Sequence, residues 1–148
     1  MVKDALKFFH AYINEMIDLG GENLPRAVST KLGSKLADII KAKGYIGLEP
    51  ALKQIYKVLG AKTSIKKIDD HSYDIVLRYS KRFCPIGGKR NPKQAKIIQN
   101  NLCIPYTRSF LSSLLPNFLF EAHIKECILD EHSNRHCNYL LETKLKNE

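Results

Sequence analysis

The spacing of apolar residues changes along the chain and separates a helical first part from a mixed second part. Up to about residue 59, apolar residues recur every three or four positions, the period of a helix with one buried face. Glycines follow each periodic run and act as stop signals. The expected helices run from Val2 to Gly20, from Pro25 to Gly44 and from Glu49 to Leu59.

Beyond Gly60 the period shortens to two residues. Apolar and polar side chains alternate from Tyr73 to Ser80, which indicates a half-buried strand. The other expected elements are a weaker strand at 63–68, helices at 91–99 and 105–115, and an antiparallel strand pair at 118–129 and 136–143. This order predicts an α+β fold, in which N-terminal helices precede an antiparallel sheet made of two strand pairs joined by a helical crossover.

Length and composition agree with one domain spanning residues 1–148, without an internal repeat or linker. The chain is 44% apolar and 26% charged, the balance of a folded globular protein. We find no run of the roughly 18 to 20 apolar residues that a membrane helix needs. The first residues also lack the apolar core of a secretion signal. We therefore expect a cytoplasmic protein without membrane insertion.

The net charge of +9 is concentrated in one stretch. Between Ile75 and Phe120 there are eight Lys or Arg residues and no Asp or Glu, and six of them crowd residues 81–96. These six are Lys81, Arg82, Lys89, Arg90, Lys93 and Lys96. Such a field can attract nucleic acid or a small anion, or can simply be a solvated surface. No recognition-helix, RNP or zinc-finger pattern accompanies it.

All four cysteines fall within the last 65 residues. Cys127 and Cys137 are expected to face each other across the last strand pair, where opposed Cα atoms lie roughly 4.5 to 5.5 Å apart. Cys103, at the start of a helix, completes a corner of three thiols. Metal ligands, buried inert thiols and a disulfide all remain open. The candidates for a fourth metal ligand are Cys84, Glu126, His132, His136 and water.

In a regular strand, two nearby side chains cannot reach a metal ion bound by Cys127. His123 is four residues from Cys127, which is roughly 13 Å of strand. Glu126 points to the opposite face of a regular strand. Either side chain needs a bulge to reach the same ion as Cys127.

Three motifs resemble the 4-vinyl reductase domain family, whose members bind small hydrophobic molecules. They are Arg78-Tyr79-Ser80-Lys81-Arg82-Phe83-Cys84-Pro85, Cys103-Ile104-Pro105-Tyr106-Thr107-Arg108-Ser109-Phe110-Leu111, and the pair Glu126-Cys127 with His136-Cys137-Asn138-Tyr139. They occur in the family's order over about 65 residues. The resemblance implies a fold shared with haem-based nitric-oxide sensors and Golgi-transport subunits.

The resemblance also implies a zinc site beside an apolar ligand pocket, and a homodimer formed by the N-terminal helices. By the family's pattern the zinc ligands are Cys103, Cys127 and Cys137. The Glu that completes the site in some relatives is replaced here by Ile124, and the chain contains no Trp. The fourth ligand is therefore open, with Cys84 and Glu126 as substitutes.

Three classes of function follow. The first is a sensor domain that encloses a small apolar ligand, with pocket candidates that serve equally well as plain core: Phe8, Phe9, Tyr12, Leu36, Ile40, Tyr56, Phe110 and Leu114. The second is an enzyme of tetrapyrrole or thiazoline-type metabolism that uses the metal site, with His123, His132 or His136 as candidate acid–base groups. The third is a nucleic-acid-binding regulator acting through residues 81–96.

Overall fold

The computed structural model describes residues 2–130 and 135–147, apart from the side chains of residues 2, 3, 5, 6 and 9. Its elements are α1 (Val2–Gly20), α2 (Asn23–Ala42), α3 (Leu48–Val58), β1 (Lys62–Asp69), β2 (Ser72–Arg78), α4 (Pro92–Ile98), α5 (Ile104–Leu114), β3 (Phe118–Glu126) and β4 (His136–Leu145). The α+β class and the order of helices and strands are those predicted from the sequence.

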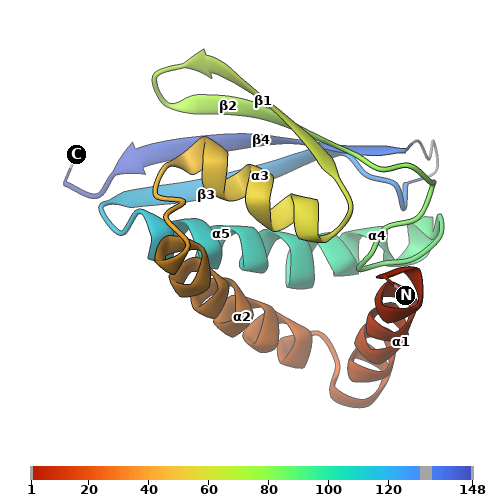
Figure 1. Ribbon diagram of the computed structural model, residues 1–148. Coiled ribbons are helices and arrows are strands. Elements are labelled where there is room, and N and C mark those ends of the chain that lie inside the picture. Colours follow the sequence, from red (N-terminus) through yellow and green to blue (C-terminus); the bar gives the residue numbers. More distant parts are fainter. Residues whose placement is uncertain (1, 131–134, 148) are drawn as a thin grey trace.

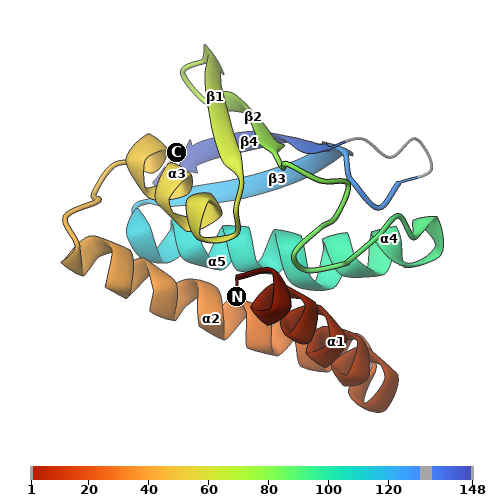
Figure 2. The same cartoon turned by 45° about the vertical axis from the view of Figure 1, so that its right-hand side comes forward.

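The four strands form one antiparallel sheet in the order β1-β2-β4-β3. The two hairpins meet through β2 and β4, where Leu77 is paired with Cys137. Figure 1 shows α3, α5 and α2 on one side of this sheet. In the turned view, α1 lies beside α2, at the end of the molecule that carries α4 (Figure 2).

The core lies between the sheet and the helices beneath it. Alternate residues of β2 and β4 point inward, and α3 and α5 cover them with fully buried side chains. The central members are Leu52, Ile55, Ile75, Phe110, Leu111 and Leu141. Burial of each such side chain stabilises the fold by roughly 1.5 to 3 kcal/mol, so this layer contributes much of the favourable free energy of folding.

Helices α2 and α5 approach each other closely at Gly33. A Cβ atom at this position would lie 2.5 Å from the carbonyl oxygen of Tyr106 and 3.0 Å from the backbone nitrogen of Phe110. Only glycine fits there without a shift of backbone. The close approach fixes the position of α5, which carries one wall of the cavity described below.

Two predicted elements differ in their details. The helices predicted at 91–99 and 105–115 are joined without a break, because a π-helical turn, Gln99–Cys103, links α4 to α5. The strand predicted at 118–129 ends at Glu126, and its pairing with β4 shifts between Ile124 and Glu126. This bulge makes Lys125 an extra residue on its strand and reverses the side to which the following residues point.

Candidate ligand-binding site

A cavity of about 70 Å³ lies between the inner face of the sheet and the helices. Its walls come from almost every element of the second half of the chain. The lining residues are Tyr56, Leu59, Leu77, Tyr79, Cys84, Ile86, Ile98, Cys103, Ile104, Tyr106, Thr107, Ala122, Ile124, Cys127, Leu129, Cys137, Asn138 and Tyr139. Most of these side chains are apolar, which is the usual character of a pocket for a small hydrophobic molecule.

All four cysteines line this one cavity. Cys84 comes from the loop after β2, Cys103 from the π-helical turn, Cys127 from the residue after β3, and Cys137 from β4. A regular strand would have placed Cys127 on the outer face, with Glu121 and His123. The bulge at Lys125 instead brings Cys127 to the inner face beside Cys137, as the predicted pairing of these two cysteines requires.

Cys127 and Cys137 interact directly. A hydrogen bond from the Cys137 thiol lowers the pKa of Cys127, and hydrogen bonds from the backbone of Leu129 and the side chain of Gln99 act in the same direction. The same bond raises the pKa of Cys137, because it is made to the ionised form of its neighbour. One negative charge is therefore better accommodated at Cys127 than at the other three thiols.

The other two thiols are neutral lining groups. Burial raises the pKa of Cys84 to about 11, and hydrogen bonds from the backbone of Gly87 and Ile86 offset it only in part. Burial also raises the pKa of Cys103 well above its usual range. A buried neutral thiol behaves as a small apolar group, so both cysteines add to the hydrophobic character of the wall.

Three hydroxyl groups make one part of the cavity polar. The hydroxyl of Tyr56 lies 2.8 Å from that of Tyr139 and 3.4 Å from Oγ1 of Thr107. These residues come from α3, β4 and α5. The hydroxyl cluster gives an otherwise apolar chamber a place where a polar ligand atom can be hydrogen-bonded.

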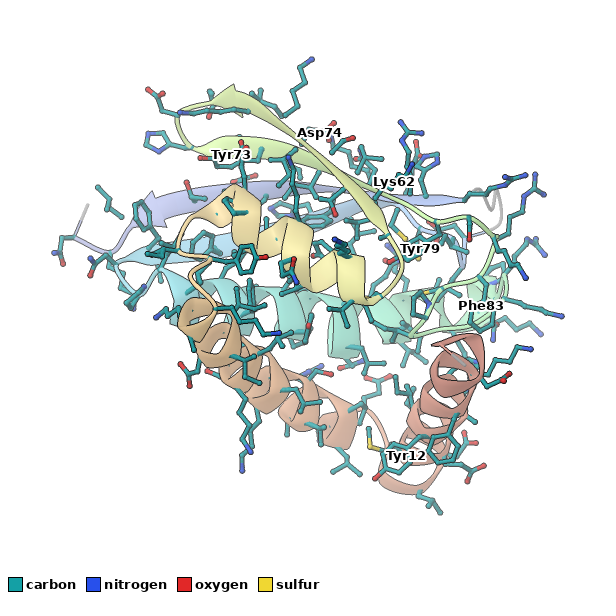
Figure 3. The ribbon with its side chains drawn as sticks, viewed as in Figure 1. Tyr12, Lys62, Tyr73, Asp74, Tyr79 and Phe83 are labelled. Atoms are coloured by element: carbon teal, nitrogen blue, oxygen red, sulfur yellow. The ribbon has the colours of Figure 1, made fainter. Side chains whose placement is uncertain are left out.

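The pocket residues proposed from sequence are dispersed. Tyr56 lines the cavity, whereas Ile40, Phe110 and Leu114 are buried in the central core and Leu36 packs against it. Tyr12 is 59% exposed and Phe8 is 75% exposed, so neither is enclosed. Figure 3 shows Tyr12 on α1, away from the sheet and from Tyr79. The side chain of Phe9 lies outside the described part of the chain.

Most of the lining residues were not among the pocket candidates predicted from the sequence, because those candidates lie on the periodic helices. The cavity is lined by inward residues of three strands, including Leu77, Ala122 and Ile124, and by Ile98, Ile104 and Tyr106 around the π-helical turn. A signal was available in the alternation of β2 and β4, since Leu77 and Tyr139 share the inner face with Cys137.

The candidates for a fourth metal ligand lie in different places in the structure. Cys84 faces the cavity, whereas Glu126 and His136 contact each other and neither lines it. Nε2 of His123 lies 3.4 Å from Oε1 of Glu142. His132 lies outside the described residues. Among the residues that the structure describes, no three His, Cys, Asp or Glu side chains are grouped closely enough to hold a metal ion.

The basic stretch between residues 81 and 96 forms an exposed surface on α4 and the loop before it. All six Lys and Arg side chains named above are exposed. Nucleic-acid binding by this surface stays a prediction. In the described part of the chain, no helix has the length and apolar character needed to cross a membrane.

Comparison with known proteins identifies the fold. No family model matches the sequence, and neither does any curated protein. Among solved structures, the chain is similar to subunit 3 of a trafficking protein particle complex from Naegleria fowleri, covalently bound to palmitic acid. The TM-score is 0.64 at 14% identity, with 97% of this chain and 95% of that chain covered.

A second solved structure has the same fold. It is the phenol-responsive sensory domain of the transcription activator PoxR, with phenol. The TM-score is 0.55 at 15% identity, and the match covers 93% of this chain and 73% of that chain. The chain therefore has the fold of these two proteins, and a fold shared with a transport-complex subunit is one that the sequence resemblance implied. Membership of the 4-vinyl reductase domain family stays a prediction.

Proposed function

We propose that this chain is a regulatory or sensor domain that binds a small, mainly apolar molecule in the cavity lined by the four cysteines. The observation that carries the proposal is the combination of an apolar chamber with one hydroxyl cluster, at Tyr56, Tyr139 and Thr107. The apolar part of a ligand would occupy the apolar chamber, and a single polar group at its end would accept or donate a hydrogen bond at the hydroxyl cluster. The ligand class is supported by two proteins of the same fold that hold palmitic acid and phenol.

The test places a larger side chain from strand β3 in the cavity. Ala122 lines the chamber, whereas its neighbour His123 is exposed on the other face of β3. Titration with 1-propanol, monitored by isothermal calorimetry, is expected to show binding to the wild type and to His123→Phe. Ala122→Phe is expected to weaken binding tenfold or more because the new ring occupies the chamber. Native mass spectrometry of the purified protein should also reveal any apolar molecule retained from the cell.

Two results would contradict this proposal. One is a wild-type protein that binds no 1-propanol. The other is an Ala122→Phe variant that stays folded, as judged by its thermal melt, and binds as tightly as His123→Phe.

We propose separately that zinc binds at the thiols of Cys103, Cys127 and Cys137, with Cys84 as the fourth ligand. Thiolates are the preferred ligands of structural zinc, and these four thiols surround one cavity. Bound zinc would hold the thiolates in their ionised form and tie together the four segments that carry them. Those segments would have to move closer, since the described residues show no group of three at ligand spacing.

Metal analysis and a thiol count decide between zinc and free thiols. Zinc predicts about one metal ion per chain, with loss of metal in Cys103→Ser and retention in a variant of an exposed residue such as Lys53→Ser. Four reactive thiols in denaturant, without metal in the protein as purified, would rule zinc out. Binding of 1-propanol is measured independently of the metal content.

A homodimer formed by α1 and α2 is a third proposal. Large apolar side chains are exposed on both helices: Phe8, Tyr12, Leu19, Leu24, Leu32 and Ile39. Exposed apolar groups that cluster on one part of a surface often mark an interface. Light scattering after size exclusion should give twice the chain mass of 16.9 kDa, and Leu19→Lys should shift it toward the monomer. A wild-type monomer at high micromolar concentration would contradict the dimer.

A further inference from the structure

A second apolar cavity lies under α1. Its volume is about 90 Å³. Ile13 of α1, Ser29 and Leu32 of α2, and Leu102 of the π-helical turn line this second cavity and not the first. Ile13 is only 1% exposed, whereas Leu32 is 46% exposed, so the cavity reaches from the buried face of α1 to the surface of α2.

The two cavities share one wall. Leu59, Ile86 and Tyr106 line both of them. Each of these side chains is only partly buried, in contrast to the fully buried core residues. Side chains occupy discrete staggered rotamers, and a change of rotamer at these positions can join two adjoining spaces into one.

We propose that the two cavities form the two ends of one channel, which binds an elongated alkyl or acyl chain rather than a compact molecule. This proposal rests on the proposed function and adds the shape of the ligand. The polar end would lie at the hydroxyl cluster of Tyr56 and Tyr139, and the tail would pass Leu59, Ile86 and Tyr106 to end against Ile13 of α1.

The volumes set the expected length of the chain. A cavity of about 150 Å³ holds one benzene molecule, which is roughly 25 Å³ per carbon. The first cavity of about 70 Å³ then accommodates roughly three carbons, and the second of about 90 Å³ roughly three to four. A chain of about three carbons therefore fills the first cavity alone, whereas a chain of about six carbons needs both.

Helix α1 is coupled to the shared wall through His10. Nδ1 of His10 donates a hydrogen bond to the carbonyl oxygen of Ile86 at 3.1 Å, and its Nε2 accepts one from the side-chain amide of Asn14, also at 3.1 Å. Gly88 leaves room for the ring, since a Cβ there would lie 2.5 Å from Nε2. The helix that covers the tail end of the channel thus also holds one of the residues between the two cavities.

The experiment compares chain lengths. Straight-chain 1-alkanols of three to ten carbons are titrated into the full-length protein by calorimetry. In the wild type, affinity is expected to rise about three- to fourfold per added methylene and to level off at about six carbons. Ser29→Leu narrows only the second cavity, so the rise in affinity should stop at about three carbons while the affinity for 1-propanol is unchanged. Lys31→Leu, an exposed position on the same helix, is the matched control.

Leu102→Ala provides a change in the opposite direction. It enlarges the second cavity, so affinity should keep rising with chain length for one or two more carbons than in the wild type. The channel is ruled out if 1-propanol binds but longer chains bind no more tightly, or if Ser29→Leu and Leu102→Ala leave the chain-length profile unchanged. If no alkanol of any length binds, the ligand-binding function itself fails and the channel fails with it.

Discussion

The hydroxyl groups of Tyr56 and Tyr139 lie 2.8 Å apart in the interior and join helix α3 to strand β4. Burial raises the pKa of Tyr56 to about 12, although the hydrogen bonds to Thr107 and Tyr139 oppose this rise. Both phenols are therefore neutral at physiological pH, and each can donate one hydrogen bond and accept another. The pair crosses the space between the helical layer and the sheet, and thus defines the polar part of the cavity.

Removing one of the two hydroxyl groups should lower the stability of the fold measurably. Tyr139→Phe leaves Tyr56 with only the longer contact to Thr107. We expect the free energy of unfolding to fall by about 1 to 2 kcal/mol, since a buried donor or acceptor loses its partner. Urea unfolding measures this, with the exposed Tyr12→Phe as control. Equal stability of the two variants would show that the 2.8 Å contact contributes little.

The approach of α2 to α5 predicts an unusual outcome for a glycine substitution. In an exposed helix interior, Gly→Ala stabilises by up to about 1 kcal/mol. At Gly33 the new Cβ would meet the carbonyl oxygen of Tyr106 at 2.5 Å, which requires the helices to separate. We expect Gly33→Ala to lower the free energy of unfolding by about 1 to 3 kcal/mol. A thermal melt that rises instead would mean that the two helices separate at little cost.

A substitution at Gly88 should loosen α1 specifically. This residue has a φ of +84°, and its missing side chain leaves room for the His10 ring. Gly88→Ala combines backbone strain with displacement of His10. Hydrogen exchange should become faster at the amides of α1, while those of the central strands β2 and β4 keep their protection. Uniform loss of protection across the whole chain would contradict this local effect.

Stability should fall at alkaline pH in part through Cys84. Its pKa rises from 9.0 in the unfolded chain to about 11 in the fold, because burial disfavours the thiolate. A raised pKa means that the contribution to stability is complete below pH 9 and is lost as the pH rises through about 11. The loss attributable to this group is about 2 to 3 kcal/mol.

The control for this pH dependence is Cys84→Ala, which keeps every other titrating group. Metal-free, reduced protein is unfolded with urea at intervals from pH 8 to pH 11. The difference in unfolding free energy between wild type and variant should shrink across that range. A constant difference would show that Cys84 is not the group responsible.

The elements followed from local patterns because their determinants are local. Glycines after each apolar period mark the ends of α1 and α3, and alternation identified β2 from Tyr73 onward. The end of β3 was predicted incorrectly, because a bulge depends on the partner strand and has no local signature at Lys125. The join between α4 and α5 was missed because Pro105 suggested a new helix, whereas the π-helical turn carries the chain through.

By itself, the sequence determined the α+β class and placed the four thiols at or near the ends of expected helices and strands. These properties depend on side-chain periodicity, which is encoded within about ten residues of each position. Only the tertiary structure decided which side chains face the cavity. Strand register placed Cys137 beside Leu77, the bulge turned Cys127 inward, and packing sent Phe110 and Leu114 into the core while leaving Tyr12 exposed. Each of these outcomes depends on contacts between residues far apart in the chain, which no local pattern contains.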